Sequence, residues 1–308
     1  MRTTVGARVG WAPAVSRRSL RLRPRGVGLY LLPAALFLAV LALYPFIELI
    51  HMSVSQVSSD NIFGDWPFIG TAGVQAVAVT ADFREAAVNS LIYVGLVVGV
   101  GLGGGLAAAL VLWRGGPLSG FTLALMVFSW ALPGLINGVD WRFLLDPRGM
   151  VDTILSVARV APVYWLVEGR LPLVSVALVN AWTVVPFATL VFRAALLDMP
   201  GEVLAAAEVD GARPRQTLRY IVLPLLRPTI LVLTILSLLY AFKSFDFIYI
   251  MTFGGPGTAS TTLPFLSYRL AFEIYKFSDG AAVAVITLGL IILMALVYLR
   301  SVHREERA

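Results

Sequence analysis

Charged side chains interrupt an otherwise apolar stretch of the chain at residues 229–253. Lys243 and Asp246 lie three residues apart there, which is the spacing of neighbours on one helical face. A charge inside an apolar span is costly, so it pairs with another charge or faces a watery path. The two residues therefore form either a mutual ion pair that shapes helix packing or part of a polar pathway. The other polar residues considered for that pathway are Tyr240, Ser244 and Tyr249.

A second polar interruption lies within residues 171–192 and consists of Asn180, Trp182 and Thr183. It is followed by Pro186, which can kink a helix. Such side chains either hydrogen-bond to neighbouring helices or line the route of a polar solute. The residues alone leave both interpretations open, and helix-to-helix hydrogen bonding is the simpler one.

No pattern for enzyme chemistry accompanies these residues. The chain has no cysteine, which excludes disulfides, thiol chemistry and cysteine-based metal sites. Its sequence contains no G-x-x-x-x-G-K-[ST] phosphate-binding loop, and His51 and His303 are far apart without carboxylates at ligand spacing. Gly99–Gly104 matches G-x-G-x-x-G, but it lies in an apolar run and indicates close helix packing instead. We expect no catalytic residue, no metal, no cofactor bound by this chain and no nucleic-acid partner.

The composition is that of an integral membrane protein. Of the 308 residues, 58% are hydrophobic and 14% are charged, and the mean hydropathy is +0.84. A soluble domain of this length exposes far more charge. The apolar runs are about 20 residues long, enough for a helix to cross a ~30 Å hydrocarbon core of a lipid bilayer. We predict an all-α integral membrane protein with six transmembrane helices, at residues 29–50, 86–113, 118–139, 171–192, 229–253 and 281–299.

Basic residues predict how the chain is oriented. Residues 1–28 are rich in arginine and contain no acid, so they are expected to form a basic cytoplasmic tail before a transmembrane domain at 29–300. A second cytoplasmic tail is expected at 301–308. With six spans, the segments expected inside hold most of the lysine and arginine, which places both termini and residues 198–228 in the cytoplasm. Four arginines in the outer loop at 140–170 run against this count.

The segment Asp198–Pro228 is polar and rich in arginine. Pro200 is suited to open a short helix, Gly211 to end it in a left-handed cap, and Pro214 to open a second helix. A simple connection between neighbouring helices needs only a few residues. The segment is therefore interpreted as a docking element for a soluble partner, and a basic loop on anionic lipid is the alternative.

The same segment resembles the EAA motif of binding-protein-dependent ABC import permeases. The motif-like residues are Glu202–Ala212 (EVLAAAEVDGA) followed by Ile221–Pro224 (IVLP). Three further stretches are similar to the carbohydrate-uptake branch of that family: Trp141–Pro147 (WRFLLDP), Ala181–Phe187 (AWTVVPF) and Thr252–Gly257 (TFGGPG). The resemblance covers most of the chain between the two tails.

The resemblance implies partners and a mechanism. Such a permease pairs with a second, homologous permease, and an extracytoplasmic solute-binding protein delivers the solute. Two cytoplasmic ATPase subunits hold ATP and magnesium, and their closure drives alternating access through a coupling helix on each permease. The residues that match this ATPase-docking helix are Glu202, Ala205, Ala206, Ala207, Glu208, Asp210 and Gly211.

One departure from the motif concerns its charge. The glutamate of the family falls at Ala205, and Glu202 and Glu208 lie one turn to either side. These two are the candidates to replace the missing carboxylate. Docking is accordingly expected to depend on the shape around Ala206, Ala207 and Gly211 more than on charge.

The implied function is that of a transmembrane subunit of an ATP-driven importer in the bacterial inner membrane, with a sugar or oligosaccharide as the favoured solute. Glycerol-3-phosphate or another polyol phosphate is the near alternative, although only Lys243 offers a phosphate ligand within a predicted span. A self-sufficient secondary transporter is the alternative from another class. It would need its own ion-coupling acids, and Asp246 is the only acid deep in a predicted span.

Overall fold

The computed structural model describes residues 24–305 of the chain. It divides into two compact units, residues 1–48 and 49–308. The described residues are nearly all helical, with one isolated antiparallel bridge between Ser55 and Phe68, which confirms the predicted all-α class. Most of the predicted tail at 1–28, and the last three residues of the tail at 301–308, lie outside the described residues.

Five helical stretches are long and apolar enough to cross a membrane, and a bent pair of helices raises the number to as many as six. The five are Leu31–Ser53, Ala81–Leu112, Leu171–Leu197, Pro214–Lys243 and Phe277–Tyr298. In the first stretch, α1 (Pro24–Leu38) and α2 (Tyr44–Ser53) are joined by a π-helical turn, η1 (Ala39–Leu43). The second is α4 (Ala81–Leu112), the third is α8 (Leu171–Leu197), and the last lies in α14 (Phe277–Glu305).

Two helices, rather than one, form the region of the predicted span at 118–139. These are α5 (Ser119–Ala131) and α6 (Gly134–Leu144), which are bent by 104°. Leu132 has an extended backbone with a ψ of 134°. The reason is Pro133, which disfavours helical geometry at the residue before it and has no N–H group to bond in a helix.

The predicted span at 229–253 differs from the structure at both ends. The helical stretch starts earlier, because α10 (Pro214–Thr217), the π-helical turn η2 (Leu218–Val222) and α11 (Leu223–Lys243) are continuous. A π-helical turn is one way in which a helix passes a proline, here Pro224, without ending. No separate second helix therefore forms before the span.

The stretch also ends earlier than predicted. Ser244 has a ψ of 118°, and a new short helix, α12 (Asp246–Met251), follows. The change of direction places an acidic residue in the first turn of α12, where a carboxylate interacts favourably with the helix dipole.

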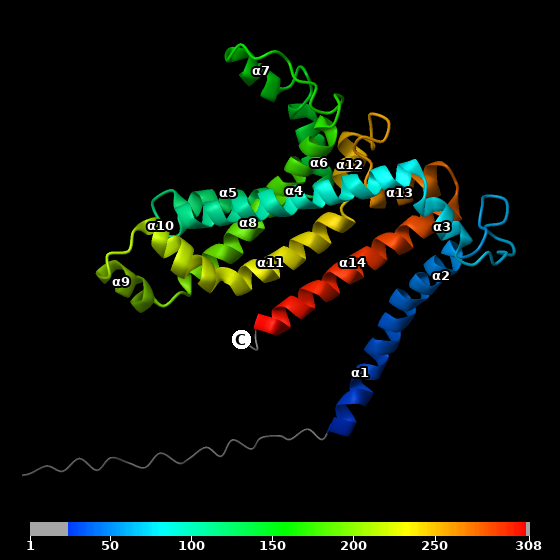
Figure 1. Ribbon diagram of the computed structural model, residues 1–308, viewed down its shortest axis with the longest axis horizontal. Helices are drawn as coiled ribbons and strands as arrows, with labels where there is room; N and C mark the ends of the chain where they lie inside the picture. The colour runs from blue at the N-terminus through cyan, green and yellow to red at the C-terminus, as the bar shows by residue number, and fades with distance from the viewer. Residues whose placement is uncertain (1–23, 306–308) are drawn as a thin grey trace, which may run out of the picture. The chain divides into compact units, whose positions relative to one another are not determined.

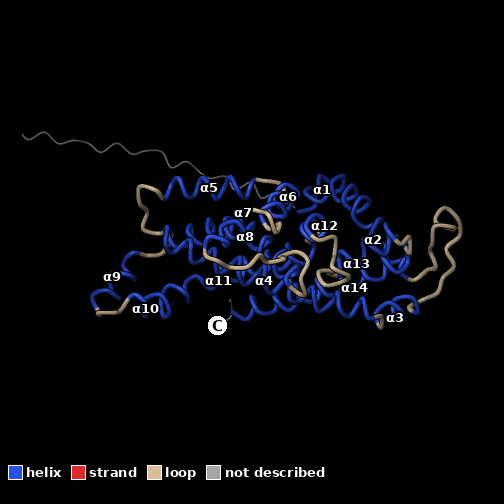
Figure 2. Tube along the Cα trace, turned by 90° about the horizontal axis from the view of Figure 1, so that it is seen from above, coloured by secondary structure: helices blue, strands red, loops and turns tan. Residues whose placement is uncertain are grey.

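The remaining helices are short and connect the spans. They are α3 (Ala72–Ala78), α7 (Met150–Val157), α9 (Gly201–Val209), α13 (Leu263–Tyr268) and the π-helical turn η3 (Arg269–Glu273). Within the unit at 49–308, α9 and α10 lie at one end of the helices, and α3 and α13 lie at the other (Figures 1 and 2).

Helix α8 is the central helix of this unit. Of its most apolar window, 56% is buried, against 28% for α4. Glycines on α4 allow the two helices to approach closely. A Cβ atom on Gly101 would lie 2.8 Å from Val184 Cγ1, and one on Gly105 would overlap Ala188 Cβ. The predicted packing role is thus confirmed for Gly101, whereas a Cβ atom on Gly99 or Gly103 would meet nothing within 4 Å among the described residues.

Candidate functional site

A buried polar cluster joins α4, α8 and the end of α11. Asn180 on α8 is 0% exposed. Its Nδ2 donates to the hydroxyl of Tyr93 on α4 at 2.8 Å and to Oγ of Ser244 at 3.2 Å. One amide group thus bonds to two other elements, at the point where α11 ends. These bonds favour the helix-packing interpretation of Asn180.

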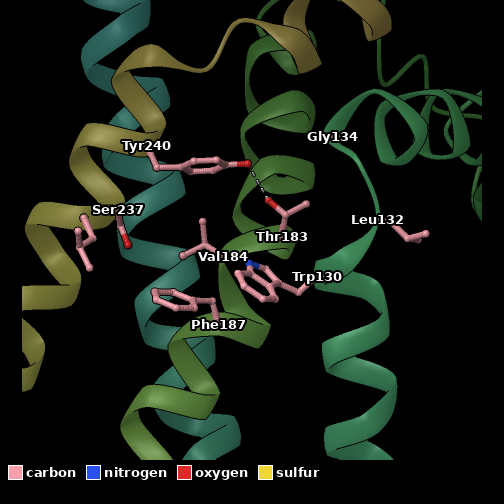
Figure 3. A pocket seen from close by; sticks show the side chains of 9 residues that line it. Trp130, Leu132, Gly134, Thr183, Val184, Phe187, Ser237 and Tyr240 are labelled. Carbon is pink, nitrogen blue, oxygen red and sulfur yellow. Dashed lines mark hydrogen bonds between the residues drawn. The ribbon is translucent and has the colours of Figure 1, made fainter. Parts of the chain in front are cut away.

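A cavity of about 400 Å³ lies next to this cluster. Figure 3 shows that Thr183 and Phe187 reach it from α8, Ser237 and Tyr240 from α11, and Trp130 from α5. Thr183 Oγ1 and the Tyr240 hydroxyl are 3.3 Å apart and share a hydrogen bond. The other residues that line the cavity are Leu132, Gly134, Val184 and Leu236.

The walls of this cavity are aromatic and uncharged. The rings of Trp130 and Phe187 are stacked, with centroids 5.6 Å apart and planes inclined by 19°. None of the lining residues carries a formal charge, and the polar groups among them are mainly hydroxyls. Ligand pockets commonly have this make-up, with apolar walls and a few oriented polar groups, and volumes of about 300–1,000 Å³. Aromatic faces and hydroxyls suit the C–H faces and hydroxyl groups of a sugar ring.

The structure separates the two charged residues that the sequence places on one helical face. Lys243 is the last residue of α11 and Asp246 the first of α12, so the helix break lies between them and that prediction is wrong. Both side chains are exposed, and among residues 24–305 no ion pair joins them. Neither residue lines the cavity.

Two aromatic candidates also lie outside the cavity. Trp182 is 48% exposed, and its ring centroid is 6.2 Å from that of Trp141 on α6. Tyr249 lies on α12, with its ring centroid 5.5 Å from that of Tyr268 on α13 and 5.8 Å from that of Phe245. Of the predicted pathway residues, the structure therefore places Asn180, Thr183, Tyr240 and Ser244 in and beside the cavity.

Several residues of this region were not predicted from the sequence. Ser237 lies three residues before Tyr240 and so shares its face of α11, and this spacing was a usable signal. Phe187 is four residues after Thr183 on α8, which is also one helical face. Trp130 and Tyr93 gave no such signal, because each comes from a different helix and meets the site only through tertiary packing.

The predicted coupling segment forms α9, a short and mostly exposed helix. Ala207 is 6% exposed and Leu204 packs on a core cluster of the bundle. Glu202, Ala205 and Ala206 are all exposed. Exposure extends to Glu208, Asp210 and Gly211 at its far end. The helix is thus held to the bundle along one edge, and its other face is open among the described residues.

The end of α9 is a Schellman turn. Gly211 has a φ of +73°, so the predicted left-handed cap is confirmed. The Ala212 N–H donates to the Ala207 carbonyl at 2.9 Å, and the Gly211 N–H donates to the Glu208 carbonyl at 3.1 Å. Together these bonds fix the angle between α9 and the helix that begins at Pro214.

A second cavity, of about 420 Å³, lies between α9 and the end of α4. Glu208 lines it from α9, and Arg114 lines it from the turn after α4. Glu202 does not line this cavity. The two glutamates are therefore not equivalent, since one faces the bundle and the other lies in the exposed first turn of α9.

These features define a class of protein, a multi-pass helical membrane subunit with an exposed helix at one end. Residues 99–305 match the family described as "Binding-protein-dependent transport system inner membrane component", and the chain belongs to this family. Members of this family are transport subunits and not enzymes. The family, the fold class and the transport role predicted from the sequence are thereby confirmed.

Named relatives support the same conclusion. The chain is 31% identical over 238 residues to the trehalose/maltose transport system permease protein MalF of Thermococcus litoralis, covering 76% of this chain and 79% of the relative. It is 30% identical over 284 residues to the sn-glycerol-3-phosphate transport system permease protein UgpA of Yersinia pseudotuberculosis, covering 91% and 95%.

A solved structure shares the fold. It is a bacterial ABC transporter involved in the import of the acidic polysaccharide alginate, with a TM-score of 0.77 and 23% identity, covering 92% of this chain and 96% of that one. The same kind of transporter has been solved with an alginate pentasaccharide-bound periplasmic protein, with a TM-score of 0.74, 22% identity and coverage of 92% and 95%.

Proposed function

We propose that this chain is one of two transmembrane subunits of an ATP-driven importer for a neutral sugar or oligosaccharide. The uncharged cavity lined by Trp130, Phe187, Thr183 and Tyr240 is the observation that carries the choice of solute. The trehalose/maltose permease among the relatives agrees with it. Both termini and α9 lie in the cytoplasm in this proposal, as the distribution of basic residues favours.

The partners follow from the exposed face of α9. A separate pair of ATPase subunits holds ATP and magnesium, and one of them receives α9 in a cleft. Ala205 and Ala206 supply the small surface of the contact, and Glu202 replaces the carboxylate missing at Ala205, because it is exposed and lies outside the bundle-facing cavity. A second, homologous permease completes the pathway, and an extracytoplasmic binding protein supplies the solute.

The continuous helical stretch Pro214–Lys243 connects the docking helix to the cavity. It begins directly after the Schellman turn at Gly211 and carries Ser237 and Tyr240 near its far end. A displacement of α9 by the ATPase therefore moves two lining residues of the cavity through one stiff element. This is the route by which ATP binding alters access to the solute.

A polyol phosphate is the second candidate solute. The sn-glycerol-3-phosphate permease among the relatives supports it, as does the exposed Lys243, three residues beyond Tyr240. A phosphate needs cationic ligands, and the cavity itself offers none among its lining residues. The neutral solute is therefore preferred.

Reconstitution tests the proposal. The chain is placed in liposomes together with a second permease and an ATPase from the same organism, with a solute-binding protein outside and ATP inside. We expect uptake of maltose or trehalose that requires ATP and the binding protein, with much weaker uptake of glycerol-3-phosphate. Uptake of glycerol-3-phosphate alone would select the second candidate. Uptake by the isolated chain under an ion gradient would reject the importer altogether.

A further inference from the structure

The cavity of about 420 Å³ beside α9 takes no part in the transport cycle proposed above. It lies between α9, the turn after α4 and the start of the helical stretch Pro214–Lys243, at the end of the unit at 49–308 where Figure 1 shows α9 and α10. Its volume is within the range common for ligand pockets, about 300–1,000 Å³. The residues of its lining indicate what kind of ligand it suits.

The floor of this cavity is apolar and ordered. Leu110, Trp113, Leu204 and Leu218 all pack on one core cluster of the bundle, and Val222 is 2% exposed. A surface that is ordered before binding loses little conformational entropy when a ligand arrives. The floor is therefore suited to the apolar part of a ligand.

One cation and one carboxylate line the same cavity. Arg114 comes from the turn after α4, and Glu208 comes from the last turn of α9. Among the described residues, no side-chain hydrogen bond or ion pair engages either group. The carbonyl end of α4 does not occupy Arg114, because Arg193 Nε donates to the Leu112 carbonyl there at 3.1 Å. The cavity therefore offers both charges to a ligand.

The cavity and the proposed ATPase contact use different faces of α9. Leu204 and Glu208 are four residues apart, so they share one helical face, and both line the cavity. Ala205 and Ala206 do not line it. A ligand in the cavity and a subunit docked on α9 therefore do not compete for the same residues.

The cavity also lies at the ends of two helical stretches that can cross a membrane. Ala81–Leu112 ends directly before Trp113 and Arg114, and Pro214–Lys243 begins at the cavity. The ends of spans lie at the level of the lipid headgroups, where tryptophan and arginine are common anchors. Basic pockets between spans bind lipid headgroups. Here a carboxylate is added to the basic group.

We propose that this cavity binds a phospholipid with a zwitterionic amine headgroup, of the phosphatidylethanolamine type. The planar guanidinium of Arg114 binds the phosphate, and the Glu208 carboxylate accepts hydrogen bonds from the ammonium. The upper parts of the acyl chains lie against Trp113 and the leucines of the floor. Bound lipid thus links α9 to the end of α4.

Glu208 makes the site selective. An anionic headgroup without an ammonium is repelled by this carboxylate. A choline headgroup has no N–H group to donate, and quaternary ammonium groups are favoured by cages of several aromatic rings. Trp113 is the only aromatic residue among the described residues that line the cavity. The primary ammonium of phosphatidylethanolamine is therefore preferred.

Titration of the full-length chain with lipid tests this proposal. The chain is purified in detergent, and bound lipid is counted by native mass spectrometry with phosphatidylethanolamine, phosphatidylglycerol or phosphatidylcholine of the same acyl chains. We expect the apparent Kd for phosphatidylethanolamine to be about tenfold lower than for the other two. Equal Kd values for the three lipids would overturn the proposal.

Two substitutions separate the roles of the charges. Arg114→Gln should raise the Kd for phosphatidylethanolamine and phosphatidylglycerol alike by about tenfold, because both carry a phosphate. Glu208→Gln should abolish the preference between them, because only the ammonium needs the carboxylate. Both side chains are exposed, so neither change disturbs the core. A preference that survives in Glu208→Gln contradicts the assignment.

Matched controls change charges that lie outside the cavity. Arg215 on α10 and Asp198 before α9 are both exposed, and neither lines the cavity. Arg215→Gln and Asp198→Asn should keep the wild-type Kd values and the wild-type preference. A loss of preference as large as in Glu208→Gln would show that general surface charge, and not this cavity, selects the lipid.

A soluble competitor identifies the source of the headgroup. O-phosphoethanolamine carries the same phosphate and ammonium without acyl chains. We expect it to leave the lipid bound at equal concentration, because the apolar floor contributes to the affinity. Displacement of the lipid under these conditions would make the occupant a soluble zwitterion and overturn the lipid assignment.

These measurements need neither the ATPase nor a transported solute. Failure of the lipid site therefore leaves the proposed function intact, and failure of ATP-driven uptake leaves the lipid site intact.

Discussion

Asn180 shows how one side chain determines a local arrangement of helices. Its amide nitrogen donates to Tyr93 and to Ser244 and is wholly buried. Thr183 lies one turn further along α8. Its hydroxyl shares a hydrogen bond with the Tyr240 hydroxyl, and both residues line the cavity. Two polar residues in the same short stretch of sequence therefore have different roles.

The role of Asn180 as a brace can be measured. Asn180→Leu leaves the hydroxyls of Tyr93 and Ser244 without this partner in a buried region, at a cost of about 1–3 kcal/mol. We expect a lower Tm in detergent, and a smaller decrease for Tyr93→Phe, which removes one of the two bonds. If Asn180→Leu keeps its Tm but loses uptake, Asn180 contacts the solute instead.

Gly211 is required for its backbone conformation. A Cβ atom at this position meets nothing within 4 Å, so a substitution strains only the left-handed backbone. That strain is about 1–2 kcal/mol for most residues and less for asparagine. We expect Gly211→Val to reduce co-purification of the ATPase and uptake, while Gly211→Asn stays close to wild type. Equal behaviour of the two variants would reject the role of the turn.

Among the helices, α4 and α8 share the most extensive contact of the unit at 49–308. Gly105 lies directly against Ala188, whereas a methyl group added at Gly103, on another face of α4, would meet nothing within 4 Å among the described residues. The stretch from α10 through α11 is placed differently, since it joins the turn at Gly211 to the cavity.

The two glycines provide a matched pair of substitutions. Gly105→Ala forces α4 and α8 apart, because its Cβ would overlap Ala188 Cβ, and overpacking of this kind costs about 1–3 kcal/mol. Gly103→Ala adds the same methyl group in open space. We expect thermal unfolding to show a lower Tm for the first variant and an unchanged one for the second. Equal Tm values would contradict the packing.

Substitutions in η2 test whether the helical stretch Pro214–Lys243 must be stiff to transmit movement. Arg219 and Tyr220 are both exposed there, so replacing them removes little packing. Replacing both residues with glycine destabilises the helix by about 1 kcal/mol at each position relative to alanine. We expect ATP hydrolysis to persist while uptake falls, and the double change to alanine to keep both activities. Uptake equal in the two double variants would show that stiffness is not needed.

For the whole molecule, the important property is an uncharged cavity within a bundle that holds its charged groups elsewhere. The cavity is assembled from α5, α8 and α11, together with the bend at Pro133. Such a lining favours a solute with many hydroxyl groups and no net charge.

The proposal that the cavity holds the solute is tested at its aromatic wall. Trp130→Ala removes one member of the stacked pair, and about 1.4 kcal/mol of lost contact corresponds to a tenfold decrease in kcat/KM for uptake. Trp182→Ala is the control, because that ring lies outside the cavity on the central helix α8. A larger loss for Trp182 than for Trp130 would place the pathway on the Trp141 side of α8.

The sequence predicted the class of the fold from hydropathy, and it predicted the short helix α9 from the proline and glycine at its two ends. Few residues other than glycine adopt the left-handed backbone found at Gly211, where the short helix ends and the chain turns. Hydropathy did not reveal the helix breaks at Leu132 and Ser244, since both lie in apolar runs. The predicted Lys243–Asp246 face was wrong for this reason.

The sequence by itself determined that the chain crosses a membrane, because the cost of placing polar groups in lipid depends mainly on composition along the chain. It also determined the family, because the motif is local. Only the tertiary structure decided which residues meet. Tyr93, Asn180 and Ser244 are far apart along the chain, and Trp130 faces Phe187 from a different helix. Such contacts depend on bends and helix packing, which no local pattern records.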